Sequence, residues 1–97
     1  MAQGLSNFYR DESMQASFEI WEGRAFLHCN VYKWNAKTLR TCYRVLGQML
    51  DKFTEMNLEA AYTISPNPKF CELMGGRYCS DIMYEDKPYG VYKWELK

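Results

Sequence analysis

Apolar side chains recur at steps of three and four between residues 36 and 56, and this pattern constrains the fold more than any other feature. They are Leu39, Cys42, Tyr43, Leu46, Met49, Leu50, Phe53 and Met56. On an α-helix this spacing gathers the side chains on one face, over about five turns. Asn35 suits the residue that caps a helix start, and Asn57 suits the left-handed residue that ends one. The sequence therefore predicts one long amphipathic helix.

Strand patterns flank this helix. Residues 17–21 and 24–34, separated by Glu22 and Gly23, predict an antiparallel hairpin; the longer of the two is rich in aromatic and β-branched side chains. The short apolar run 60–64, directly after the helix, predicts a buried strand. A strand, a crossover helix and a second strand most simply form a right-handed parallel unit.

The last third of the chain predicts a short helix and a second hairpin. In order, the segments are a proline-containing break at 65–68, a short helix at 69–74 ended by Gly75 and Gly76, a strand at 77–84, a turn at 85–89 and an alternating strand at 90–96. The predicted order is ββαβαββ, an α/β (α+β) fold with a single mixed sheet. A chain of 97 residues suits one domain, 1–97, in which residues 1–16 are expected to form an N-terminal arm, loosely attached or partly a short helix. A split ferredoxin-like sheet is the rival architecture.

Charge and cysteine content disfavour several classes of protein. The formal net charge is zero, from 12 basic and 12 acidic residues, whereas nucleic-acid binding usually rests on a basic excess. No apolar run approaches the ~20 residues of a membrane span, and residues 1–10 lack the apolar segment of a signal peptide, so we expect a cytoplasmic protein. The four cysteines, Cys29, Cys42, Cys71 and Cys79, match no zinc spacing. We expect four reduced thiols in the core and no metal site.

The charges of the long helix run against its dipole. Lys37, Arg40 and Arg44 share a face near the start, and Asp51 and Glu55 continue that face toward the end. A helix dipole favours acids first and bases last. One interpretation is surface pairing with neighbouring strands. The other is an anion site, in which Lys37 and Arg40 assist the free backbone N–H groups of the helix start in binding phosphate.

His28 is the one histidine of the chain, and it falls within a predicted strand, on the face that it shares with Phe26, Asn30 and Tyr32. A lone histidine in a strand is usually structural, but one that lines a cleft can act as a general base. The carboxylates form no recognisable acid–base pair; they are Glu19, Glu22, Glu59, Glu72, Asp81, Glu85 and Asp86. Both roles for His28 stay open at this point.

The order of elements resembles the core and C-terminal half of the GNAT (Gcn5-related) N-acetyltransferases, from about Ser17 to Leu96. The best local match is the segment AAYTISPNPKFCELMGGRY, residues 60–78, which is similar to the family's strand, asparagine, short helix and closing glycine. The resemblance implies a GNAT-like core that lacks the N-terminal strand and helices. Small GNAT-like proteins encoded by tailed phages are similarly short. If this chain is one of them, it would act in the cytoplasm of a phage-infected bacterium.

The resemblance also implies a cofactor, acetyl-CoA, in a cleft where strands 24–34 and 60–64 splay apart. The first strand would pair with the pantetheine arm, the start of the long helix would hold the pyrophosphate, and Asn67 would stand at the family's asparagine. The implied cofactor-binding residues are Cys29, Asn30, Val31, Tyr32, Lys37, Leu39, Arg40, Thr41 and Asn67.

This sequence departs from the family's pattern in three places. The family's pyrophosphate loop carries glycines, which let the backbone approach phosphates closely, whereas residues 35–41 contain none. The family's short helix usually carries a tyrosine that protonates the departing thiolate. Alignment on Gly75 places Cys71 there, and a shifted gap places Glu72 there with Ser65 at the asparagine position. Almost nothing before Ser17 matches the family's first strand and two covering helices, so the acceptor side would be open or completed by a partner subunit.

Two functions follow from this reading. If the chain is an enzyme, it is an acyl-CoA N-acyltransferase in which His28 or a nearby carboxylate removes a proton from an acceptor amine and backbone N–H groups hold the oxyanion. The alternative is a non-catalytic protein-binding module that contacts a host or virion protein, or a second copy of the chain, through its aromatic C-terminal hairpin. The residues of that hairpin would be Met83, Tyr84, Tyr89, Tyr92 and Trp94. A nucleic-acid module that stacks bases on exposed rings is a third reading, which the zero net charge disfavours.

Overall fold

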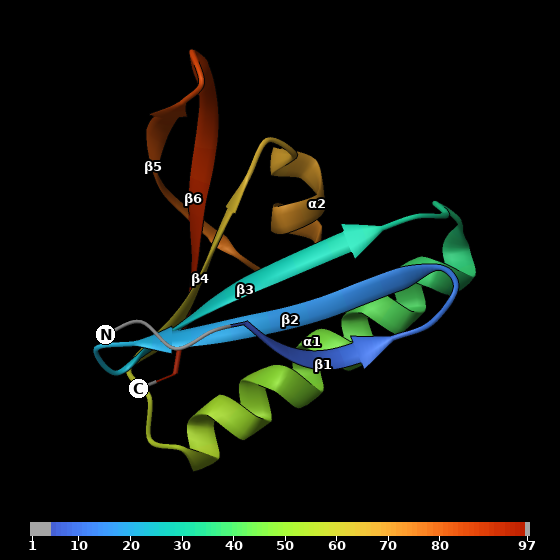
Figure 1. The fold of residues 1–97 in the computed structure, drawn as a ribbon, viewed down its shortest axis with the longest axis horizontal. Helices are drawn as coiled ribbons and strands as arrows, with labels where there is room; N and C mark the ends of the chain where they lie inside the picture. The colour runs from blue at the N-terminus through green and yellow to red at the C-terminus, as the bar shows by residue number, and fades with distance from the viewer. Residues whose placement is uncertain (1–4, 97) are drawn as a thin grey trace.

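The structure, a computed structural model, describes residues 5–96 and forms one mixed sheet with two helices (Figure 1). The elements are β1 (Ser6–Arg10), β2 (Met14–Trp21), β3 (Arg24–Val31), α1 (Ala36–Glu55), β4 (Ala60–Ser65), α2 (Pro68–Leu73), β5 (Arg77–Tyr84) and β6 (Lys87–Glu95). The strand order across the sheet is β1-β2-β3-β4-β6-β5. Strands β3 and β4 run parallel, and the other neighbouring pairs run antiparallel. The single mixed sheet predicted from the sequence is confirmed, with one further strand before it.

The N-terminal segment corrects the expectation of an arm. Residues 6–10 form β1, which pairs antiparallel with β2, and β2 begins at Met14, before the predicted start at Ser17. The Asp11 carboxylate organises the turn between them, because it accepts hydrogen bonds from the backbone N–H groups of Ser13 (2.7 Å) and Met14 (2.9 Å). Strand β1 is an edge strand of five residues, of which only two neighbouring residues are half-buried. It is therefore too short to give a clear alternating pattern in the sequence. Residues 1–4 of the expected arm lie outside the described residues.

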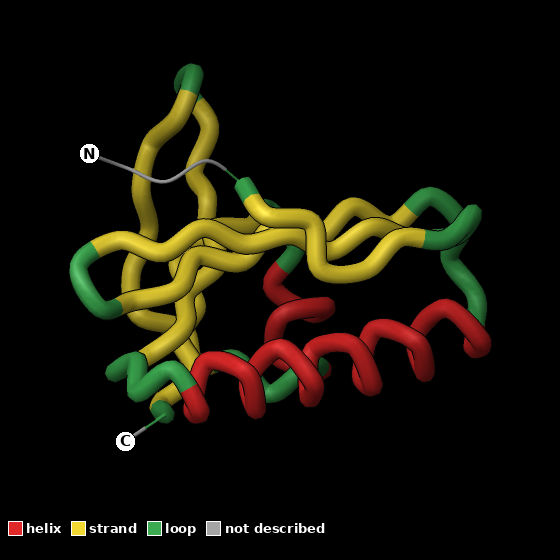
Figure 2. The backbone as a smooth tube through the Cα atoms, turned by 60° about the horizontal axis from the view of Figure 1, so that its bottom comes forward, coloured by secondary structure: helices red, strands yellow, loops and turns green. Residues whose placement is uncertain are grey.

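The connection between β1 and β2 also bears on the missing covering helices. Only residues 11–13 join these two strands, so no helix lies between them. The expected absence of the covering helices therefore agrees with the structure, whereas the expected absence of a first strand is wrong. One face of the sheet carries α1, and within residues 5–96 no helix lies across the opposite face of β2 and β3 (Figure 2).

The long helix forms as predicted, and it packs along one face of β1, β2 and β3 (Figure 2). The Asn35 side chain caps its start by accepting the Thr38 backbone N–H at 2.8 Å, and Asn57 takes a left-handed φ of 63° just after it ends. The helix residues that are buried against the sheet are Thr38, Cys42, Val45, Met49 and Phe53. Tyr43 and Met56 of the predicted stripe are exposed, because the buried face is narrower than the stripe. Among residues 5–96, neither helix is long and apolar enough to span a bilayer.

The C-terminal hairpin of β5 and β6 projects away from the layer formed by α1 and the first three strands (Figure 1). Its turn is tighter than predicted, because Glu85 and Asp86 both adopt left-handed φ angles of 50° and 64°, typical of a two-residue hairpin turn. Strand β6 therefore begins at Lys87, and every residue of β5 is exposed.

Candidate functional site

Strands β3 and β4 separate shortly after they begin to pair. The parallel pairing joins Arg24 to Ala60, Ala25 to Ala61 and Phe26 to Tyr62. Beyond Phe26 and Tyr62 the two strands no longer pair. The Phe26 and Tyr62 rings stack at the point of divergence, with centroids 5.7 Å apart. Strand β4 instead pairs with β6 along its whole length. A gap therefore opens between the C-terminal halves of the two parallel strands, as the sequence reading required.

The backbone of β3 presents polar groups to this gap. Tyr32, just beyond the strand, donates its N–H to the Ser13 carbonyl at 2.7 Å, so the even-numbered positions here face β2. The alternating positions Leu27, Cys29 and Val31 therefore direct their backbone groups toward the gap. The Thr63 hydroxyl donates to the Leu27 carbonyl at 3.0 Å and bridges the narrow end. Beyond that bridge, β4 supplies no ladder partner for Cys29 or Val31.

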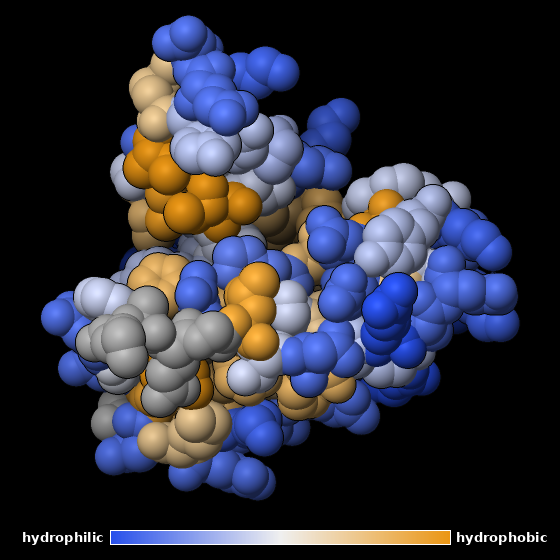
Figure 3. All heavy atoms as spheres, viewed as in Figure 1, coloured by the Kyte–Doolittle hydropathy of each residue, from blue (hydrophilic) through white to orange (hydrophobic). Residues whose placement is uncertain are grey.

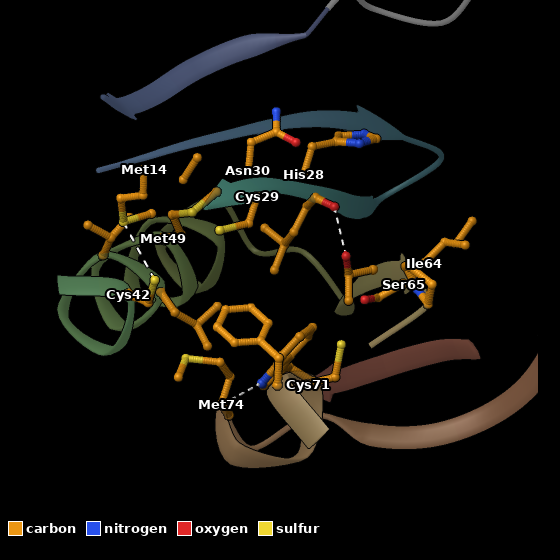
Figure 4. Close-up of a pocket in the computed structure, with 18 residues that line it drawn as sticks. Met14, His28, Cys29, Asn30, Cys42, Met49, Ile64, Ser65, Cys71 and Met74 are labelled. Carbon is orange, nitrogen blue, oxygen red and sulfur yellow. Dashed lines mark hydrogen bonds between the residues drawn. The ribbon is translucent and has the colours of Figure 1, made fainter. Parts of the chain in front are cut away.

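A cavity of about 350 Å³ occupies the gap and continues beneath β3 toward α1 (Figure 4). Its lining comes from β2, β3, α1, β4, α2 and β6, and it consists of Met14, Ala16, Leu27, His28, Cys29, Asn30, Cys42, Val45, Leu46, Met49, Thr63, Ile64, Ser65, Pro66, Phe70, Cys71, Met74 and Trp94. Most of these side chains are apolar, and His28 is the one titratable group outside the thiols. A pocket with this composition suits an apolar ligand that makes a few polar contacts.

His28 and Asn30 lie at the cavity, but their side chains point away from its interior (Figure 4). Both belong to the face of β3 that α1 does not cover. There, His28 Nε2 lies 3.3 Å from Oε1 of Glu19, which is its diagonal neighbour on β2. Both side chains are partly exposed, at 45% and 34%. Sequence analysis gave Glu19 only as one of several scattered carboxylates. A side-chain contact between two strands depends on their register, which the sequence pattern did not reveal.

Helix α2 brings one of its two candidate residues to the cavity. Cys71 is buried and lines the cavity, and burial raises the pKa of its thiol. Glu72 is exposed and lies outside the lining, so the structure does not bring it together with Cys71 and His28. Asn67 also stays outside the lining, and its side chain caps α2 by accepting the Phe70 backbone N–H at 3.2 Å.

Close packing holds α2 in place over the cavity. The helix ends at Leu73, and Gly75, two residues later, has a φ of 88°, in the left-handed region that favours glycine. A Cβ atom at Gly76 would lie 3.0 Å from the Trp94 ring, so no larger residue fits there without a shift. The Trp94 indole donates to the Met74 carbonyl at 3.2 Å, and the Tyr43 hydroxyl donates to the Leu73 carbonyl at 2.6 Å. The glycine pair predicted to close the helix thus also lets it approach β6.

Three of the four cysteines line the cavity. Hydrogen bonding to Cys42 and burial raise the pKa of the Cys29 thiol, and Cys42 donates to the Met14 thioether at 3.6 Å. All four cysteines are free, as expected, but the expectation that all four lie in the core is wrong. Cys42 and Cys71 are buried, whereas Cys29 opens to the gap and Cys79 lies on the exposed strand β5. The described residues contain no group of histidine, cysteine and carboxylate side chains that could hold a metal ion.

The start of α1 stands at the open end of the gap. Lys37 and Arg40 are exposed, and neither forms an ion pair with another residue of the described chain. Arg44, one turn further, instead lies over the Tyr9 ring at 5.7 Å. Surface pairing therefore accounts for Arg44 but leaves Lys37 and Arg40 available to an anion.

The other residues expected at this end have local roles. Leu39 is half-buried against the core, and the Thr41 hydroxyl donates to the Lys37 carbonyl of its own helix at 3.1 Å. The Tyr32 hydroxyl donates to Gln15 Oε1 at 3.1 Å, away from the gap. Sequence analysis did not predict one contact at this end of the gap. The Trp34 ring meets the Phe70 ring edge to face, with centroids 5.3 Å apart, and links the loop before α1 to α2.

Comparison with known proteins supports the fold. No family model matches the chain, and no curated protein matches it in sequence. Among solved structures, the chain is similar to the crystal structure of an aminoglycoside 6'-acetyltransferase type Ii, with a TM-score of 0.73 and 13% sequence identity. The match covers 92% of this chain but only 66% of that one. The strand order, the parallel pair that separates and this structural similarity together show that the chain has a GNAT-like fold.

Proposed function

We propose that this chain is an acyl-CoA-dependent N-acyltransferase. One observation carries the proposal: β3 and β4 part after the Phe26–Tyr62 pair, and a cavity of about 350 Å³ fills the gap between them. A parallel sheet gains hydrogen bonds by continuing to pair, so strands that part leave backbone groups in need of another partner. An extended ligand with amide groups, such as a pantetheine arm, supplies that partner.

The residues present fit a CoA thioester at both ends of the gap. The backbone groups of Cys29 and Val31 would pair with the pantetheine amides, in the manner of an added strand. Lys37 and Arg40 would bind the pyrophosphate, together with the first backbone N–H groups of α1. With no glycine in residues 35–41, the phosphates would depend more on these two cations than on close backbone contact.

The thioester supplies an activated acyl group, and this chain's residues would manage the protons. When bound, the thioester would transfer its acyl group to the acceptor nitrogen, and the sulfur would leave with the electron pair of the broken carbon–sulfur bond. His28 takes the proton that the nitrogen loses, and Glu19 holds the imidazole in orientation. Cys71, whose thiol pKa burial raises, lies in the cavity lining on α2 and would return a proton to the departing sulfur.

The acceptor would approach on the face of the sheet that α1 leaves uncovered. His28 and Asn30 lie on that face (Figure 4), Glu19 contacts His28 there, and no helix between β1 and β2 covers it. A bulky acceptor can therefore reach the gap, and so can a partner subunit that completes the site.

Calorimetric titration of the full chain with CoA and acetyl-CoA tests the proposal. We expect saturable binding to one site and a rise in melting temperature with ligand concentration. Ser65→Trp, which places a large ring in the cavity lining, should abolish binding. Ser80→Trp, an equal change on the exposed strand β5, should not. The absence of heat and of a thermal shift at millimolar ligand would refute the proposal.

A second candidate function is protein binding through the projecting hairpin. All eight residues of β5 are exposed, and apolar side chains gather on this part of the molecule (Figure 3). The large exposed ones are Tyr78, Ile82, Met83 and Tyr84. Tyr92 and Trp94, which the sequence reading included in this surface, instead face inward, with Tyr92 only 2% exposed. The partner would be a second copy or, following the resemblance to phage proteins, a host or virion protein in the bacterial cytoplasm.

Sedimentation velocity distinguishes a second copy of the chain from a different protein as the partner. Dimers that dissociate when Met83→Lys is introduced would support a second copy as the partner. A chain that stays monomeric and retains no protein in a pull-down would count against the binding function. His28→Ala should leave the result of either assay unchanged, because His28 lies outside the hairpin.

A further inference from the structure

Sulfur-containing side chains are concentrated around the cavity. The chain has four cysteines and six methionines, and six of these ten residues line the cavity. Those six are Met14, Cys29, Cys42, Met49, Cys71 and Met74. Cysteine and methionine often serve as ordinary core residues, so their number alone does not indicate a site. The arrangement of three of them does.

Met14, Cys29 and Cys42 form a sulfur cluster that links β2, β3 and α1. The Cys42 sulfur lies 3.6 Å from the Met14 sulfur, and the Cys29 thiol is close enough to Cys42 to share a hydrogen bond with it. Cys29 pairs across the strands with Ala16, which lies two residues from Met14 on the same face of β2. Figure 4 shows the Cys29 and Cys42 side chains entering the cavity from facing walls. Two thiols and one thioether therefore meet in one part of the cavity.

The distance between the Cys42 and Met14 sulfur atoms suits a shared metal ion. Metal–sulfur bonds of about 2.3 Å that meet at tetrahedral to trigonal angles hold two sulfur atoms about 3.8–4.0 Å apart. At 3.6 Å, the two sulfur atoms enclose the proton that the Cys42 thiol donates to the thioether. An ion that displaces this proton therefore requires the sulfur atoms to separate only slightly.

The ligands of the sulfur cluster select a soft ion. Hard cations such as Mg²⁺ and Ca²⁺ require oxygen ligands, and no carboxylate of residues 5–96 lines the cavity. Structural Zn²⁺ takes four ligands, and the one histidine at the cavity, His28, points away from its interior (Figure 4). Thiolate and thioether ligands together favour copper(I). The cluster therefore differs in kind from a group of histidine, cysteine and carboxylate ligands, of which the described residues contain none.

We propose that Met14, Cys29 and Cys42 bind one copper(I) ion. The two thiols each release a proton to solvent and bind as thiolates, Met14 binds as a neutral thioether, and no electron is transferred. The ion enters past Cys29, which is exposed at the gap, and reaches the buried Cys42 and Met14. The complex carries one negative charge, which water solvates through the opening at Cys29. This site does not depend on the proposed function, because its ligands are side chains and not the backbone edge of β3.

Anaerobic titration of the full, reduced chain with the copper(I) complex of bicinchoninate tests the proposal. We expect the chain to remove one copper(I) ion from this coloured complex, and the melting temperature to rise as copper(I) binds. X-ray absorption at the copper edge should show only sulfur neighbours. A chain that removes no copper(I), or whose copper(I) has nitrogen or oxygen neighbours, overturns the proposal. Neither result bears on CoA binding.

Two variants with matched controls locate the site. Met14→Leu removes the thioether and keeps an apolar side chain of similar volume, and Cys29→Ala removes the exposed thiol. Each should weaken copper(I) binding at least about tenfold, because even the loss of a contact to a metal ligand costs that much. Met83→Leu and Cys79→Ser make comparable changes on the exposed strand β5 and should leave the affinity unchanged.

Thermal unfolding shows whether each variant is folded. Cys29 is exposed, so its variant keeps the proposal testable if Met14→Leu fails to fold. A folded Cys29→Ala variant that binds copper(I) as tightly as the original chain overturns the proposal. So does a Cys79→Ser variant that loses as much affinity as Cys29→Ala, because the chain would then bind copper(I) through any accessible thiol.

Discussion

Removal of the positive charge at the start of α1 should weaken CoA binding and stabilise the protein at the same time. Lys37 lies in the first turn, where the helix dipole disfavours a cation by about 0.3–1 kcal/mol. No acidic residue offsets it there, and no ion pair within the described chain involves it. The chain therefore carries a charge that costs it stability, which is expected where a binding site needs that charge.

Lys37→Ala should raise the melting temperature by about 1–8 °C, which is what 0.3–1 kcal/mol amounts to in a domain of this size. Lys37→Ala combined with Arg40→Ala should weaken CoA binding about 3- to 30-fold, since each exposed charge contributes about 0.3–1 kcal/mol to an anion contact. High salt should shrink this difference, because both side chains are exposed and ions screen them.

Calorimetry with CoA and with pantetheine, which has no pyrophosphate, distinguishes a phosphate contact from a general loss of affinity. The double variant should bind pantetheine as the original chain does. Lys52→Ala, at the last turn of the same helix, is the matched control and should slightly destabilise the protein without affecting CoA. Equal CoA affinity for the double variant and the original chain would refute the placement of the pyrophosphate.

Three further perturbations test other parts of the structure. Gly76→Ala should destabilise the fold by about 1–3 kcal/mol in urea unfolding, because its Cβ would lie 3.0 Å from the Trp94 ring; unchanged stability would mean that α2 shifts freely. Trp34→Ala removes the ring contact with Phe70 at the open end of the gap, so stopped-flow measurements should show faster CoA association; an unchanged rate would mean that this contact does not limit entry. Hydrogen bonds hold the pKa of Asp11 well below its usual range, so its contribution to stability is present above about pH 4 and is lost as the pH falls below it. Asp11→Asn should remove that part of the acid sensitivity of the melting temperature, and an identical pH profile for the two proteins would contradict this.

Local signals made α1 and the end of α2 predictable from the sequence. Asn35, Asn57 and Gly75 each satisfy a need of the backbone within a few residues of themselves, so their neighbours suffice to identify them. The pairing of Glu19 with His28 could not be read in this way, because it depends on the register between β2 and β3.

The resemblance, rather than the residue pattern, supplied the expectation that β3 and β4 separate. Their sequences read as ordinary buried strands, and nothing in Leu27 or Thr63 alone indicates where pairing ends. The divergence follows because β4 pairs along its whole length with β6. Strand β6 belongs to the β5–β6 hairpin, which leaves the plane of the first three strands (Figure 1). Long-range geometry of this kind is a property of the sheet and not of any single strand.

Two of the departures from the acetyltransferase pattern act at different places in the cleft and would have different consequences. At the open end, residues 35–41 contain no glycine, so phosphate binding would depend on Lys37, Arg40 and the first N–H groups of α1. On α2, Cys71 lies in the cavity lining, where the family's short helix usually carries a tyrosine. The first departure would bear on the affinity for CoA, and the second would bear on the return of a proton to the departing sulfur. The two are therefore tested by different measurements, because the first should appear in the binding of CoA and the second in the rate of acyl transfer.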